Sequence, residues 1–385
     1  MISKSTMLNS KDNSHVNIDL SIFLPALFLI SIGIVMISSS SLSWAQYKFN
    51  EPLFWIKRHT FYVLLSLTLM FFSFHTPVRV WRKYSFPLLM FCIVLLVIVL
   101  LPGIGIERNG SQRWINVFGF TLQVSEWIKL SFIAFVAHYL ADNRTILLSD
   151  PKPLIPIFLI FFLISFLLIL EPDFGSFVLL GFTLISILFI SGIKLRYFLI
   201  LSLLALLSFW LLAESSPYRL SRITSYLDPW SQQFSSGYQL TQALIAFGRG
   251  EWFGVGLGQS VQKMLYLPEA HTDFVFAIFA EEFGFFGVLI LVGTYCFIIF
   301  RILSLSWSYL NKKDFFSGFF LLGIGTLFAG QTFINLGVNS GLLPTKGLTL
   351  PFLSYGGNSL LVSCIMLGIV LRLASDMRES KEVGK

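Results

Sequence analysis

The sequence predicts an all-α protein that crosses a membrane about ten times, with one large loop on the outer side between the seventh and eighth spans. The 385 residues are 55% hydrophobic and only 12% charged, which is too apolar for a soluble domain. Apolar runs of roughly twenty residues, the length that crosses a hydrocarbon core, recur along nearly the whole chain. The Lys and Arg residues also gather on one set of connecting segments.

Each apolar run gives one expected membrane helix. The predicted spans are 19–41, 55–75, 85–102, 125–141, 154–171, 174–192, 195–214, 272–300, 315–338 and 352–373. The first span follows a polar tail and is one of many, so we interpret it as a membrane anchor and not as a cleaved signal. This layout leaves a tail over 1–18, a membrane domain over 19–373 and a second tail over 374–385.

Charge asymmetry orients the predicted bundle. An even number of spans puts both termini on one side. Of the 27 Lys and Arg residues, 16 fall on the segments of that side and six on the short loops of the other side. The long segment 215–271 is left out because long loops cross membranes largely regardless of charge. Both termini are therefore expected in the cytoplasm. The same asymmetry accounts for the net charge of +7, so nucleic-acid binding is not indicated.

The cysteines indicate neither a metal site nor a disulfide framework. Cys92, Cys296 and Cys364 all fall inside apolar runs and have no paired spacing with His or with one another. We expect them to be packing residues. No spacing of Ser, His and Asp identifies a nucleophilic triad.

Three polar stretches are expected on the outer side, at 103–124, 215–271 and 339–351. They are the candidates for function. The third is punctuated by proline and glycine. Because irregular backbone near membrane depth needs a covering of protein or water, we expect this stretch to fold back over the bundle.

Asp273 lies where the long outer loop meets the eighth span. A carboxylate held at this boundary loses part of its hydration, which makes it a better proton acceptor near neutral pH. The alternative is structural. Pro268 would then open a helix, and Glu269 and Asp273 would favour its positive N-terminal end.

Further charges stand within or beside the predicted spans. Glu126 and Lys129 stand one turn apart at the start of the fourth span, where they could serve a substrate or lock two helices together. Glu281 and Glu282 lie about two turns inside the eighth span and are expected to face the bundle interior. The link 171–173 holds two carboxylates, more than a turn requires.

The long loop also offers glycines and positive charge. Residues 247–258 contain closely spaced glycines that permit tight turns and close approach to a ligand. No predicted strand precedes them, so neither a Rossmann fingerprint nor a P-loop is supported. Candidate cations on the outer side are Arg219, Arg222, Arg249, Lys263 and Lys346. Such a side chain could meet a phosphate or a lipid headgroup.

Three segments, at 237–250, 266–273 and 343–357, resemble the signature segments of the SEDS family of membrane proteins, in particular its cell-division branch, FtsW. The similarity runs from the first span to the last. Two positions depart from the common pattern: Val124 stands where proline is usual, and Asn358 where serine is usual.

The resemblance implies a peptidoglycan glycosyltransferase that polymerises lipid II on the outer face of the cytoplasmic membrane. The donor would be a glycan linked through a diphosphate to a polyprenyl lipid, and Asp273 would be the general base. The resemblance also implies substrate-binding residues, for which our candidates are Arg219, Arg249, Lys263, Lys346, Glu126, Lys129, His271 and Glu269. A divalent cation, Mg²⁺ or Mn²⁺, could help to offset the diphosphate charge, and no cofactor is certain.

Two other functions stay open at this point. The chain could be a lipid II transporter, with Glu126, Lys129, Glu281 and Glu282 marking a passage, or a scaffold for division proteins. The resemblance further implies a class B penicillin-binding transpeptidase as partner, together with other divisome proteins, and a location at the division septum.

Overall fold

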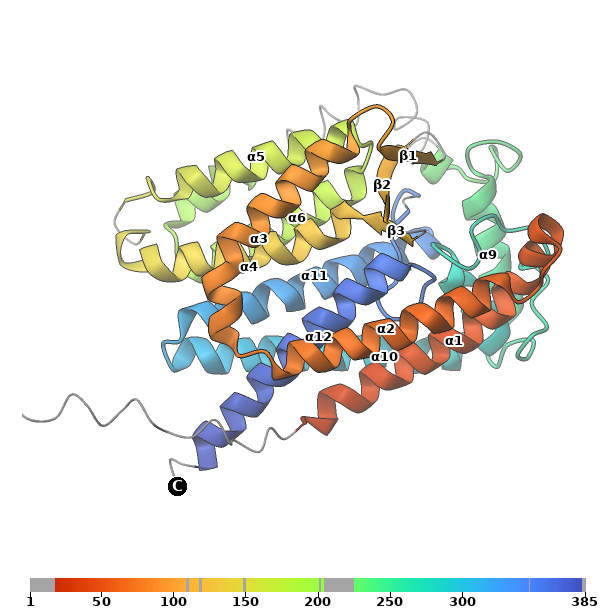
Figure 1. Ribbon diagram of the computed structural model, residues 1–385. Coiled ribbons are helices and arrows are strands. Elements are labelled where there is room, and N and C mark those ends of the chain that lie inside the picture. The colour runs from red at the N-terminus through yellow and green to blue at the C-terminus, as the bar shows by residue number, and fades with distance from the viewer. Residues whose placement is uncertain are drawn as a thin grey trace, which may run out of the picture.

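The computed structural model describes residues 18–108, 111–117, 120–147, 150–200, 202–203, 225–345 and 347–382. Most of these residues lie in long helices that run alongside one another (Figure 1). The helices are α1 Leu20–Phe49, α2 Phe54–His75, α3 Val78–Val99, α4 Val124–Leu147, α5 Leu154–Leu170, α6 Phe174–Ser191, α9 Tyr238–Gly250, α10 Val275–Asn311, α11 Phe315–Asn339 and α12 Gly357–Glu382.

The prediction of a helical, multi-pass membrane protein is confirmed. Seven of the described helices are long and apolar enough to cross a membrane: α1, α3, α4, α6, α10, α11 and α12. Helix α2 coincides with the predicted second span, and α5, with 17 residues, coincides with the fifth. The predicted span 195–214 lies largely outside the described residues, so the count of ten stays a prediction.

Helices α4, α11 and α12 form the buried centre of the bundle. In the most apolar stretch of each, 78%, 72% and 89% of the residues are buried, against 39% in α1 and 22% in α10. Helix α12 packs along α2, while α11 packs against α10, α4 and α6. The outer helices therefore expose apolar side chains, which suits contact with lipid tails.

Glycines allow the central helices to approach their neighbours closely. A side chain at Gly323 of α11 would collide with Ile133 of α4, and one at Gly368 of α12 would collide with Ser73 of α2. The Ser73 hydroxyl uses this proximity to donate to the carbonyl of Ile365 at 3.0 Å. In a membrane, where no hydrophobic effect drives helices together, such close packing and interhelical hydrogen bonds hold the bundle.

The first outer stretch forms a small sheet that the sequence analysis did not predict. Its strands are β1 Gly105–Arg108, β2 Ser111–Val117 and β3 Phe120–Gln123, antiparallel in the order β1-β2-β3. The Asn358 side chain, at the start of α12, donates to the carbonyl of Thr121 at 2.7 Å and so ties the sheet to the bundle. These three short strands are a small addition to a protein that is otherwise helical.

The long outer segment contains a helix that the sequence analysis also missed. Helix α9 lies across the outer end of the bundle (Figure 1) and packs on α10. Its buried residues Leu240, Ala243 and Ala246 recur at helical spacing. Gly250, the last residue of α9, comes so close to α10 that a side chain there would collide with the carbonyl of Ala280.

Helix α10 is broken at Gly284. The φ of 65° and ψ of −166° at this residue are open almost only to glycine. Because 37 residues of helix measure about 55 Å, α10 is much longer than a hydrocarbon core of about 30 Å. The part after Gly284 is long enough to span by itself. The predicted span 272–300 therefore ends too early, since the helix continues to Asn311.

An ionic cluster gathers three helices at the end of the bundle opposite Asp273. Asp19 caps α1, and its carboxylate accepts a hydrogen bond from Arg301 of α10 at 3.2 Å. It also forms an ion pair with Arg378 of α12 at 2.7 Å. Burial by itself raises the pKa of Asp19, but Ser21 and the two arginines outweigh it and hold the pKa below its usual value.

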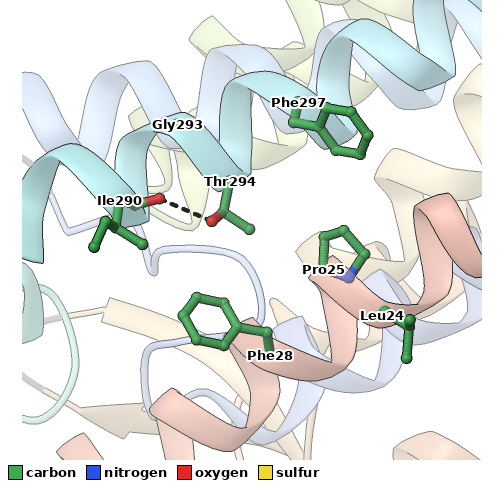
Figure 2. A pocket seen from close by; sticks show the side chains of 7 residues that line it. All are labelled: Leu24, Pro25, Phe28, Ile290, Gly293, Thr294 and Phe297. Atoms are coloured by element: carbon green, nitrogen blue, oxygen red, sulfur yellow. Dashed lines mark hydrogen bonds between the residues drawn. The ribbon is translucent and has the colours of Figure 1, made fainter.

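An apolar groove of about 440 Å³ lies between α1 and the second part of α10 (Figure 2). Its lining residues are Leu24, Pro25, Phe28, Ile290, Gly293, Thr294 and Phe297. The Thr294 hydroxyl donates to the carbonyl of Ile290 at 2.8 Å, so its proton is already used within α10. Because Leu24 and Pro25 lie near the start of α1, beside the Asp19 cluster, the groove is far along the bundle from Asp273.

Candidate active site

Asp273 precedes the first residue of α10 by two positions and is half-buried. The helix begins at Val275, so Pro268 does not open it, but Asp273 does lie beside its N-terminal end, as the structural alternative predicted. The Asp273 carbonyl accepts from two side chains of α11, Asn335 at 3.0 Å and Asn339 at 2.9 Å. The main chain at Asp273 is therefore fixed from the buried centre of the bundle.

The Asp273 carboxylate lies against the outer loop that follows α11. A Cβ atom at Gly347 would stand 2.7 Å from Oδ2 of Asp273, closer than an ordinary contact. Only a residue without a side chain leaves the carboxylate in this position. The loop was among the segments predicted from the sequence as candidates for function, but no role was predicted for Gly347.

The loop itself is tied to the bundle by hydrogen bonds to its main chain. The Gln331 side chain donates to the carbonyl of Thr349 at 2.8 Å, and the Tyr295 hydroxyl donates to the carbonyl of Pro351 at 2.5 Å. Residues 350–354 are buried. This confirms the expectation that the stretch folds back over the bundle.

Glu126 and Lys129 meet in a buried ion pair at the start of α4. The Lys129 Nζ atom lies 2.8 Å from Oε2 of Glu126, and the two side chains are 1% and 8% exposed. Their contact is an ion pair without hydrogen-bond geometry, because Nζ makes no hydrogen bond among the described residues. Burial strengthens the attraction between the two charges, so Lys129 is held by Glu126.

Arg113 of β2 clamps the turn between α5 and α6. Its guanidinium donates to the carbonyls of Glu171, at 3.1 Å, and of Pro172, and lies 3.9 Å from the Asp173 carboxylate. Burial raises the pKa of Asp173, but Arg113 and hydrogen bonds from Ser125 and Ser176 outweigh burial and hold that pKa below its usual value. Asp173 is thus a charged cap of α6.

Glu171 differs from its neighbour in this turn. Its side chain is fully buried, and neither carboxyl oxygen has a hydrogen-bond partner among the described residues. Burial, with the negative charge of Asp173, raises the pKa of Glu171 to about 9, although Arg113 lowers it. Near neutral pH the turn therefore holds one neutral carboxylic acid, Glu171, and one carboxylate anion, Asp173.

Two of the predicted cations are engaged by α10. Arg249 lies 3.1 Å from Glu281, and Lys263 lies 2.7 Å from Glu282. Lys263 is 7% exposed and also donates to Ser39 of α1 at 2.8 Å. These contacts wrap the segment 249–263 around the first part of α10. As expected, Glu281 and Glu282 are buried.

Glu269 and His271 flank Asp273 in different environments. Glu269 is exposed and accepts from the Thr272 hydroxyl at 2.6 Å. His271 is buried beside Trp55 and Tyr355, with ring centroids 5.2 and 5.8 Å away. Burial lowers the pKa of His271, an effect that Lys48 reinforces and Glu269 opposes. A neutral, buried imidazole shapes the loop and is a poor anion ligand.

Not every candidate can be placed. Arg219, Arg222 and Lys346 lie outside the described residues. In the described part of the chain, no group of three or more His, Cys, Asp or Glu side chains is arranged to hold a metal ion.

Asn335 and Asn339, whose side chains hold the main chain of Asp273, were not predicted from the sequence, although polar side chains inside an apolar helix are a signal of function.

The chain is similar to proteins of known kinds over nearly its whole length. The family model of FtsW, RodA and SpoVE, described as cell cycle proteins, matches residues 19–379. A relative from Saccharophagus degradans, named probable peptidoglycan glycosyltransferase FtsW, is 44% identical over 96% of this chain and 95% of its own length.

Two solved structures share the fold. One, described as a peptidoglycan synthase complex that coordinates polymerization and crosslinking, has a TM-score of 0.74 and 27% identity, covering 94% of this chain and 99% of the other. Thermus thermophilus RodA, a rod shape determining protein, has a TM-score of 0.69 and 26% identity, covering 94% and 98%. The chain therefore belongs to the FtsW, RodA and SpoVE family of cell cycle proteins.

Proposed function

We propose that this protein is a peptidoglycan glycosyltransferase that polymerises lipid II, with Asp273 as general base. One observation carries the proposal: the Asp273 carboxylate lies, half-buried, at the outer end of the helix bundle against a loop that the bundle holds in place. The relative from Saccharophagus degradans is named a probable peptidoglycan glycosyltransferase, which supports the same reaction.

In the proposed reaction, the 4-hydroxyl oxygen of the acceptor sugar attacks C1 of the donor sugar. The bond between O4 and C1 forms while the bond between C1 and the diphosphate oxygen breaks, and its electron pair leaves with the diphosphate. The hydroxyl proton passes to the Asp273 carboxylate, and the configuration at C1 inverts. Because a diphosphate leaves readily as an anion, one carboxylate suffices where glycoside hydrolysis needs two.

Charge that grows on the diphosphate needs a cationic partner. Three candidates are described. Arg249 is paired with Glu281, but its side chain is 42% exposed and so can be reached from solvent. Lys129 is buried in its ion pair with Glu126, and Lys263 is buried in its ion pair with Glu282. Arg219 and Lys346 stay candidates by resemblance. A divalent ion, Mg²⁺ or Mn²⁺, would add positive charge. Such ions often bind through substrate phosphates together with one or two carboxylates.

The proposal includes a partner and a place. We propose that the chain works with a class B penicillin-binding transpeptidase and other division proteins at the septum of the bacterial cytoplasmic membrane. The solved relative described as a synthase complex for polymerization and crosslinking supports a partner of this kind. Equal polymerisation with and without the transpeptidase would contradict its proposed role in activity.

The test is polymerisation of purified lipid II by the protein with its transpeptidase. Asp273→Asn keeps the volume of the side chain and removes the base, so we expect a folded protein that makes no glycan. Asp228→Asn is the matched control, because Asp228 is an exposed aspartate of the same outer segment. Normal product from Asp273→Asn would refute the assignment. A titration with Mg²⁺ and Mn²⁺ in the same assay shows whether a metal contributes.

A further inference from the structure

Three buried carboxamides follow one another along α11. Gln331, Asn335 and Asn339 are spaced four residues apart, so they lie on one face of the helix, and none is more than 1% exposed. Each donates to a main-chain carbonyl of another segment. We name these three residues the amide ladder. Burying a polar side chain in a membrane helix costs free energy unless its hydrogen bonds are satisfied. Here the acceptors are main-chain carbonyls of the candidate site.

Asn335 and Asn339 both donate to the carbonyl of Asp273, at 3.0 and 2.9 Å. The Asn339 side-chain oxygen also accepts from the Ala277 amide at 3.2 Å, which fixes the first turn of α10. A carbonyl oxygen accepts two hydrogen bonds, and here both come from neighbouring turns of one buried helix. The main chain on either side of the carboxylate therefore has a single position relative to α11.

The same ladder fixes the opposite wall of the site. The second N–H of Asn335 donates to the carbonyl of Leu348 at 2.6 Å, and Gln331 holds the carbonyl of Thr349 at 2.8 Å. Leu348 directly follows Gly347, against which the carboxylate lies. One amide group, that of Asn335, thus joins the residue that bears the carboxylate to the loop that faces it.

We propose that Asn335 and Asn339 are positioning residues that set where the Asp273 carboxylate stands relative to the outer loop. The inference rests on the proposed role of Asp273 as general base. Neither amide has an N–H left for a substrate, because Asn339 spends its second N–H on the carbonyl of Asn335 at 2.9 Å. Their loss should affect the chemical step and not the binding of lipid II.

The test compares Asn335→Ala and Asn339→Ala with Ser306→Ala. Ser306 is also buried and donates to a main-chain carbonyl between α10 and α11, that of Gly318 at 2.7 Å, but at the far end of the helices. Rates are measured per folded molecule in the complex with the transpeptidase, and kcat and KM for lipid II are determined separately. A displaced base should lower kcat about 10- to 100-fold with KM within about twofold. Ser306→Ala should retain both values.

The values of kcat and KM distinguish a positioning role from a role in stability or in substrate binding. If both Asn variants keep the wild-type kcat per folded molecule, the positioning role is refuted, and the ladder serves stability only. A higher KM at unchanged kcat would also overturn it, because the amides would then contact substrate. If the wild type itself makes no glycan, the proposed function fails before this inference is reached.

A double variant adds a second, independent readout. Asn339→Ala and Gly347→Ala should both act by moving the same carboxylate. Their combined loss of kcat should then be clearly smaller than the product of the two single losses. Losses that multiply would show that the two residues act separately, which would contradict the proposal.

Discussion

Replacing Gly347 by alanine perturbs the candidate site with a single methyl group. The new Cβ would stand 2.7 Å from Oδ2 of Asp273, whereas ordinary contacts begin at 3.4 Å. The nearest atom is the end of a side chain and not main chain, so the carboxylate can rotate away. The substitution should therefore move the proposed base while leaving the fold in place.

The expected effects on stability and on activity differ in size. Turning the aspartate away from its preferred rotamer costs about 0.5–1.5 kcal/mol. Alanine also has less conformational freedom than glycine in the unfolded chain, which stabilises the folded state by about 0.4–1 kcal/mol and offsets part of this cost. The free energy of unfolding should thus change by less than about 1 kcal/mol. A displacement of the base by about 1 Å, in contrast, lowers the rate about 100-fold.

The assay is polymerisation of lipid II together with thermal unfolding of the same preparations. Gly248→Ala is the matched control, because a Cβ at this exposed position of α9 meets no atom within 4 Å. We expect wild-type activity from the control and a folded but nearly inactive Gly347→Ala. A Gly347→Ala protein that polymerises at the wild-type rate would refute the argument that the loop defines the position of the carboxylate.

Two further predictions concern buried charge. The folded pKa of Glu171, about 9, exceeds the ordinary 4.5, so stability should fall as pH rises between these values, by at most about 1.4 kcal/mol per pH unit. In Glu171→Gln the melting temperature should depend less on pH than in the wild type. Equal slopes of melting temperature against pH in the two proteins would contradict this. Lys263→Met leaves Glu282 unpaired and should cost about 3–5 kcal/mol. Adding Glu282→Leu should restore most of that stability in thermal unfolding, and KM for lipid II should stay unchanged. A raised KM would instead indicate that Lys263 contacts the substrate.

Much of the fold could be predicted because the membrane imposes a simple rule. A chain that crosses hydrocarbon must satisfy its backbone within each helix, so runs of apolar residues reveal the spans. The pairing of Glu126 with Lys129 followed from helical spacing alone. Asp273 was singled out because it lies where the long loop meets an apolar span, and the resemblance to a known family gave it the role of base.

The parts that were missed depend on contacts between distant segments. The strands β1 to β3 are four to seven residues long and are stabilised by pairing, so they leave no long pattern. Lys263 meets Glu282 and Ser39 only after α1 and α10 have packed together. Helix α9 was missed for another reason, since its buried residues do recur at helical spacing within a segment we treated as a loop.

The buried charges bear on whether the protein polymerises or transports lipid II. A transport passage needs polar groups that can exchange partners as a substrate moves. Glu281 instead accepts from the amides of Val261 and Gln262 and from Ser260, besides pairing with Arg249. These bonds tie the segment around residues 260–262 to α10 and leave Glu281 committed to it. The charges of α10 are therefore explained as supports for the outer face, where Asp273 stands, and this arrangement favours chemistry at that face over movement through the bundle.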